Sequence, residues 1–130
     1  MSPAAVVPFV LLGLAAAAGV NLLREPTDRA QGSSSWAVRV GAQPARKLTL
    51  LLGALGILAA PLVLPAEATR DQLAMVELPA LALLAFNATT WRSADARLPG
   101  ARAFVLRNAF AAAVAVISWA ALWLLATPID

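Results

Sequence analysis

The chain has 130 residues, of which 61% are hydrophobic and only 13% are charged, about half the charged share of a soluble domain. A soluble protein of this size would lack the polar residues needed to cover its core, so the composition indicates a membrane protein and excludes a disordered, collagen-like or coiled-coil chain. The net charge is only +3, which is too small to indicate a nucleic-acid-binding domain.

The sequence contains no Cys, His or Tyr. Disulfides and Cys-ligated metal sites are therefore excluded, and the commonest ligand of transition metals is missing. The commonest general base is missing as well, Lys47 is the sole lysine, and the acidic residues are dispersed along the chain. We therefore expect no enzyme activity, no catalytic residues, no cofactor and no bound metal.

A first apolar segment over residues 3–23 is long enough to cross a bilayer as a helix. Ser2 is a candidate N-cap, and Pro26 is expected to end the helix because the residue before a proline avoids helical geometry. Arg24 and Arg29 follow the apolar segment and no basic residue precedes it, which is the reverse of the order in a secretory signal peptide. We expect this span to be retained.

Three further spans are predicted over residues 44–64, 70–91 and 102–126. Pro61 and Pro65 should loosen the far end of the second span. The third should begin after Thr69, which has capping-box spacing to Gln72. The predicted fold class is all-α: one membrane domain over residues 1–130, formed by a bundle of four transmembrane helices.

The basic residues predict how this bundle is oriented. Four spans would place both termini and the 66–71 turn on one side of the membrane, and the loops over 24–43 and 92–101 on the other. Only Arg70 lies on the side of the termini. Nine basic residues lie on the opposite side: Arg24, Arg29, Arg39, Arg46, Lys47, Arg92, Arg97, Arg102 and Arg107. By the positive-inside rule, both loops are cytoplasmic and both termini face outward.

The first loop contains two further features. The run Gln31-Gly32-Ser33-Ser34-Ser35 is typical of a flexible hinge. The segment after it, residues 36–40, alternates apolar and polar residues and is expected to be a short edge strand or a segment on the lipid headgroups, with Trp36 at the interface.

Polar residues inside predicted spans form a candidate intramembrane site, which comprises Glu77, Asn87, Arg107 and Asn108. If the turn between spans three and four centres near Arg97, Asn87 lies level with Arg107. Glu77 would lie about ten residues of helix away, roughly 15 Å, which prevents a direct ion pair with Arg107 within one chain.

Arg107 and Glu77 cannot pair with each other, so each needs another partner or another environment. Arg107 is expected to extend to the cytoplasmic interface or to donate to the Asn87 carbonyl. Glu77 could meet Arg70 through water, accept a hydrogen bond from Ser118, or remain protonated. Pro79 follows Glu77 closely and should kink the helix. This pairing favours a structural role, with a gated proton or cation site as the alternative.

The remaining features suggest contacts with lipid or with other subunits. Small residues four apart, in Gly13-x-x-x-Ala17, Ala15-x-x-x-Gly19 and Gly56-x-x-x-Ala60, allow close helix approach. Four tryptophans are candidate partner or lipid contacts: Trp36, Trp91, Trp119 and Trp123. Trp119 and Trp123 share one helix face and could meet a partner subunit or a lipophilic ligand such as a quinone.

These features predict a small non-catalytic subunit that packs against larger proteins in a membrane complex. The alternative is a homo-oligomeric channel or proton-coupled transporter that uses Glu77. The expected partners are membrane lipids and other membrane subunits or copies of the same chain, with no nucleic acid. The Ala-rich, Lys-poor composition suggests a bacterial protein, multi-pass in the plasma (inner) membrane.

Overall fold

The computed structural model describes residues 3–32, 39, 41–90 and 98–126. Within these ranges the chain is mostly helical and no residue lies in a strand. The elements are a 3₁₀ turn η1 (Pro3–Ala5), α1 (Val6–Ala30), α3 (Ala42–Leu58), a 3₁₀ turn η2 (Ala60–Leu62), α4 (Arg70–Thr90) and α5 (Leu98–Ala126). The predicted all-helical class is confirmed. Ser2, most of the predicted hinge and all of segment 36–40 except Arg39 lie outside the described residues.

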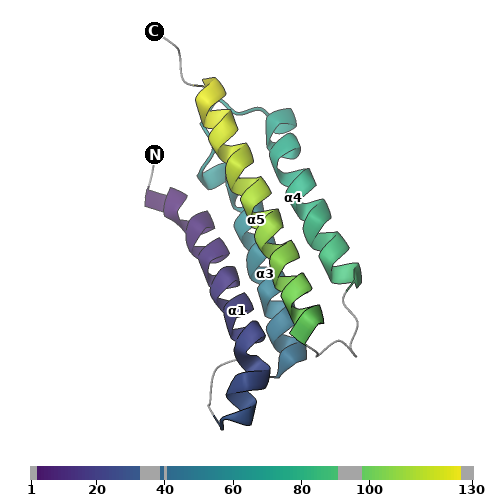
Figure 1. Cartoon of the computed structure of the whole chain (residues 1–130). Helices are drawn as coiled ribbons and strands as arrows, with labels where there is room; N and C mark the ends of the chain where they lie inside the picture. The colour runs from purple at the N-terminus through teal and green to yellow at the C-terminus, as the bar shows by residue number, and fades with distance from the viewer. Residues whose placement is uncertain (1–2, 33–38, 40, 91–97, 127–130) are drawn as a thin grey trace.

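The four α-helices of the described chain form an up-and-down bundle (Figure 1). The main packed pairs are α1 with α3, α4 with α5, α1 with α5, and α3 with α4. Each of these pairs is antiparallel, and the beginning of α1 lies at the same end of the bundle as the end of α5. This arrangement brings residues from three or four helices to the same level of the interior.

Helix α1 continues past the predicted end at residue 23 and runs through Pro26 to Ala30. A proline disfavours the helix through one lost hydrogen bond and a steric clash. Leu22, one turn before Pro26, packs against Ala45 of α3 and Phe104 of α5, and the helix continues beyond the proline. The helix ends where Gly32, at φ +73°, adopts the left-handed conformation that favours glycine. The predicted loop over residues 24–43 is therefore wrong at both ends, because residues 24–30 and 42–43 are helical.

Helix α3 is shorter than the predicted span over residues 44–64. It begins after Gly41 and has 17 residues, and the chain around Pro61 forms the 3₁₀ turn η2 instead, in line with the loosening that the prolines predict. Three segments of the described chain are long and apolar enough to cross a membrane: Pro3–Arg24, Arg70–Thr90 and Arg102–Ala126. They support a transmembrane protein, whereas the predicted fourth crossing needs a separate argument.

The other two helices begin for local reasons. The capping box at the start of α4 is confirmed: the Gln72 backbone N–H donates to Thr69 Oγ1 at 3.2 Å, and the Thr69 N–H donates to Gln72 Oε1 at 2.9 Å. Helix α5 begins at Leu98, four residues before the predicted start. Pro99 is compatible with this start because the first turn of a helix does not use its backbone N–H groups.

The buried side chains form two apolar clusters at different levels of the bundle. The cluster nearer the loop between α1 and α3 contains Leu22, Ala45 and Phe104. The larger cluster lies toward the other end and contains Ala5, Leu12, Ile57, Ala60, Val63, Leu64, Val76, Ala80, Leu84, Ala111, Ala115 and Trp119. Large apolar side chains are also exposed on all four helices, among them Val10, Leu51, Met75 and Phe110. Such a surface suits lipid rather than water.

The three predicted small-residue spacings behave differently. A Cβ atom on Gly56 would lie 2.8 Å from Leu12 Cδ2, so α3 and α1 touch there. A Cβ on Gly19 would lie 3.2 Å from Val105 Cγ1, at the contact between α1 and α5. By contrast, a Cβ on Gly13 would meet nothing within 4 Å. Two of the three faces are therefore used inside the bundle, while Gly13 faces outward.

Candidate functional site

Four polar side chains, Thr49, Asn87, Arg107 and Asn108, lie between the two apolar clusters. We call them the polar layer. They come from α3, α4 and α5, and three of them are buried: Asn87 has no exposed surface, Thr49 has 1% and Asn108 has 9%. Polar side chains in such a position are stable only when they are hydrogen-bonded.

Three of the four side chains, Asn87, Arg107 and Asn108, satisfy this requirement through contacts between helices. Arg107 Nε donates to Asn87 Oδ1 at 2.7 Å, which is possible in only one orientation of the amide because a guanidinium has no acceptor. Asn87 Nδ2 then donates to Asn108 Oδ1 at 2.7 Å and to the Phe104 carbonyl at 3.0 Å. Asn108 Nδ2 is consequently directed at α3, where it donates to the Thr49 carbonyl at 3.4 Å.

The contact between Asn87 and Arg107 was one of the two predicted solutions for that arginine. The prediction assumed a turn centred near Arg97, which placed the two residues at one depth, and the structure brings them into direct contact. Arg107 is half-buried and so does not need to extend fully to the interface. Whether this cluster has a function beyond packing stays a prediction.

Two members of this region were missed by sequence reasoning. Thr49 has no distinguishing motif; its hydroxyl donates to the Ala45 carbonyl within its own helix, at 2.8 Å. Arg46 was counted only among the loop charges, yet it is 3% exposed and its guanidinium lies 5.9 Å from the centre of the Phe104 ring. An arginine one turn before Thr49 on the same helix face is the signal that could have identified it.

Glu77 does not join the polar layer. It lies ten residues before Asn87 on α4, is half-buried, and makes no hydrogen bond or ion pair with the described residues. The predicted hydrogen bond from Ser118 is wrong, because that hydroxyl donates to the Val114 carbonyl of its own helix at 2.7 Å. Pro79 lies inside α4, which remains continuous from Arg70 to Thr90.

The two tryptophans that the structure describes, Trp119 and Trp123, both contact residues within the bundle. Trp119 is 1% exposed and packs edge-on against Phe9, with ring centres 5.6 Å apart, so the prediction that it contacts a partner or lipid at the surface is wrong. Its face of α5 is covered by α1. Trp123 is half-buried and donates its indole N–H to the Val63 carbonyl at 2.7 Å, next to η2. Trp36 and Trp91 lie outside the described residues.

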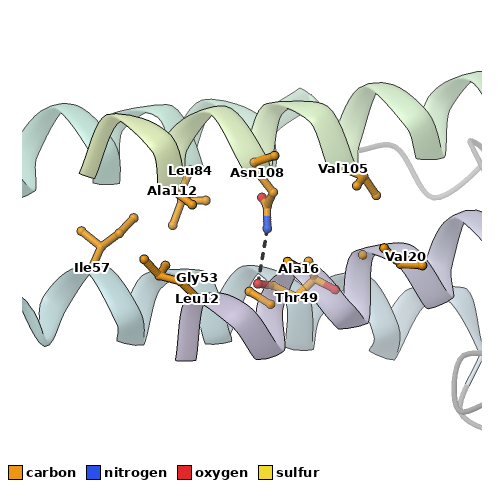
Figure 2. Close-up of a pocket in the computed structure, with 13 residues that line it drawn as sticks. Leu12, Ala16, Val20, Thr49, Gly53, Ile57, Leu84, Val105, Asn108 and Ala112 are labelled. Carbon is orange, nitrogen blue, oxygen red and sulfur yellow. Dashed lines mark hydrogen bonds between the residues drawn. The ribbon is translucent and has the colours of Figure 1, made fainter. Parts of the chain in front are cut away.

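A cavity of about 210 Å³ borders the polar layer on the side of α1 (Figure 2). Asn108 reaches into this region from α5 toward Thr49, with apolar side chains on either side. Helix α1 contributes the most residues to its wall. The lining residues are Leu12, Ala15, Ala16, Gly19, Val20, Thr49, Gly53, Ile57, Leu84, Val105, Asn108, Ala109 and Ala112.

The polar layer can hold α3, α4 and α5 in register, and the cavity can accept an apolar group beside an amide. Comparison with known proteins adds no assignment to these features. The chain matches no family model, no curated protein and no solved structure.

Proposed function

We propose that this chain is a non-catalytic accessory subunit of a membrane protein complex, built as a four-span bundle in the bacterial inner membrane with both termini outside. The observation that carries the proposal is a contrast between interior and surface. The polar layer is satisfied by contacts among its own helices, whereas large apolar side chains are exposed on all four helices. The surface that is available to other molecules is therefore largely apolar helix surface, which suits lipid and other transmembrane helices.

The fourth span depends on α3. Its 17 residues correspond to about 25 Å of α-helix, and the three residues of η2 add about 6 Å. The combined length is close to the roughly 30 Å of a bilayer hydrocarbon core. Helix α3 also runs beside α1 and α4, antiparallel to both, and its exposed residues Leu48, Leu51 and Leu55 are apolar. A helix in this position crosses the membrane together with its neighbours α1 and α4.

The orientation follows from charge. Of the eight basic residues in the described ranges, seven lie toward the end of the bundle where α1 ends and α3 and α5 begin, and only Arg70 lies at the other end. This asymmetry favours a cytoplasmic location for the basic end.

Cysteine labelling can test the crossing and the orientation together, because the chain has no cysteine of its own. Gln31 and Glu67 are both exposed, at opposite ends of α3. In cells with an intact inner membrane, an impermeant maleimide should label Glu67→Cys at once and Gln31→Cys only after permeabilisation. The reverse pattern would contradict the orientation. Labelling of both variants from one side would contradict the crossing of α3.

Native mass spectrometry of the protein, extracted gently from its own membrane, tests the accessory role. Foreign membrane subunits that stay bound at fixed stoichiometry are the expected result. A uniform homo-oligomer without other subunits would contradict it and would favour the channel or carrier instead. In that case Glu77→Gln should alter transport or its pH dependence, since Glu77 is the acidic side chain inside α4 without a described partner.

A further inference from the structure

The cavity beside the polar layer has the features of a small-molecule site. Its wall is apolar except for Thr49 and Asn108. Ala16, Val20 and Ala109 line it and are themselves exposed, so the cavity opens between α1 and α5 toward the surroundings of the bundle. A ligand entering there arrives from the hydrocarbon of the membrane, which requires it to be lipophilic.

One side chain in the wall can orient such a ligand. Asn108 is 91% buried, and its Nδ2 carries two hydrogens but has one acceptor among the described residues, the Thr49 carbonyl at 3.4 Å. That contact is long for a hydrogen bond between nitrogen and oxygen. Because Arg107 and Asn87 fix the orientation of the Asn108 amide, its N–H groups, and not its carbonyl, are offered toward α3 and the cavity. The ligand must therefore supply an acceptor.

The depth of Asn108 narrows the class of ligand further. Asn108 follows Arg102, the first residue of the apolar part of α5, by six residues, which places it about 9 Å along the span. Ester groups of phospholipids lie at the edge of the hydrocarbon, so an acyl chain reaching this depth has no acceptor to offer. A quinone ring is an apolar molecule of the membrane interior that carries ring carbonyls.

The size of the cavity also fits a ring. A dry protein cavity of about 150 Å³ holds benzene, and the cavity here measures about 210 Å³. Gly19 and Gly53 leave two parts of its wall without side chains. A substituted six-membered ring could lie among α1, α3 and α5, with any isoprenoid tail leaving through the opening between α1 and α5.

We propose that this cavity binds the ring of a lipophilic quinone, with Asn108 Nδ2 donating a hydrogen bond to one ring carbonyl. The proposal concerns binding only and is independent of the accessory role. Duroquinone is a suitable probe because its fully methylated ring does not add to nucleophiles. Durene has the same ring and methyl groups without the carbonyls.

The experiment measures binding of both probes to the full chain in lipid nanodiscs, by calorimetry with empty nanodiscs as the blank. Duroquinone should bind saturably at one site per chain. Durene should bind about fivefold more weakly or worse, which is the loss expected for one hydrogen bond. Equal affinity for the two probes would overturn the proposal, because the cavity would then be an apolar space that accepts any hydrocarbon group, including a lipid acyl chain. Absence of saturable duroquinone binding would overturn it too.

Substitutions in the cavity wall test whether duroquinone binds in this cavity. A Cβ on Gly53 would lie 3.5 Å from Leu84 Cδ1 and 3.8 Å from Asn108 Nδ2, which are ordinary contacts, so Gly53→Ala adds a methyl group to the cavity wall without a clash. It should weaken duroquinone binding about tenfold, and the larger Ala112→Leu should abolish it. Gly13→Ala is the matched control, because its Cβ meets nothing within 4 Å and lies outside the cavity. If all three variants bind duroquinone like the parent chain, the site lies elsewhere and the assignment is wrong.

Discussion

Replacement of Asn87 by leucine is the sharpest test of the polar layer. Asn87 has no exposed surface, and its side chain makes three contacts to α5: it donates to the Phe104 carbonyl and to Asn108 Oδ1, and it accepts from Arg107 Nε. Leucine has the same branched side-chain skeleton as asparagine, with bulkier methyl groups in place of the amide oxygen and nitrogen, so it leaves no large cavity. The substitution therefore removes the hydrogen bonds without emptying the site.

The expected size of the effect follows from the number of contacts. Hydrogen bonds between transmembrane helices contribute on average about 0.6 kcal/mol each and at most about 1.7 kcal/mol. Three bonds lost together should lower the free energy of unfolding by about 2 kcal/mol. Arg107 limits the loss, because its long stem lets the guanidinium move toward the interface once its acceptor is gone.

Reversible unfolding in bicelles, followed by tryptophan fluorescence, would measure this change. Asn21→Leu is the matched control: the Asn21 amide donates only within its own helix, to the Ala17 carbonyl at 3.0 Å, so the change should be within about 0.5 kcal/mol. If Asn87→Leu also stays within that range, or stabilises the bundle, the polar layer does not hold α4 to α5 and the reasoning is refuted.

Three further substitutions test other contacts, each by the same unfolding measurement. Gly56→Ala should destabilise by about 1–3 kcal/mol, because its Cβ would lie 2.8 Å from Leu12 Cδ2; Leu12→Ala in the same chain should recover part of this loss, and no recovery would argue against a clash. Thr69→Ala should cost about 1 kcal/mol through loss of the α4 cap, and an unchanged stability would mean that the cap is unimportant. Trp123→Phe removes the hydrogen bond to the Val63 carbonyl and should cost about 1 kcal/mol, whereas a neutral result would show that η2 does not need this tether.

Local signals in the sequence predicted well the parts of the fold that depend on local physics. The capping box at Thr69 places its helix within one residue, because the reciprocal hydrogen bonds need only four consecutive residues. The contact between Asn87 and Arg107 was also predicted, although the two residues are not equally far from the turn: Asn87 lies three residues before the end of α4, and Arg107 lies nine residues after the start of α5.

Where tertiary packing decides, the sequence was a poorer guide. Pro26 is a strong local signal for a helix end, yet α1 continues to Ala30, with Leu22 packed against Ala45 of α3 and Phe104 of α5 one turn before the proline. From the sequence, Arg46 was counted among the basic residues beside the loops. In the bundle it is buried against Phe104, a residue 58 positions away in the chain. Neither outcome can be deduced from neighbours in the chain, because the compensating contacts come from other helices.

The site that emerged from the structure depends on a third helix, and this explains why the sequence could not predict it. Two helices suffice to predict that Arg107 meets Asn87, but the orientation of Asn108 requires the whole relay from Arg107 through Asn87 to Thr49 on α3. The same relay turns a donor toward a cavity whose wall is mostly supplied by α1 and α5. A guanidinium with no acceptor capacity thus determines, two side chains away, that a ligand hydrogen-bonded to Asn108 in the cavity must supply the acceptor.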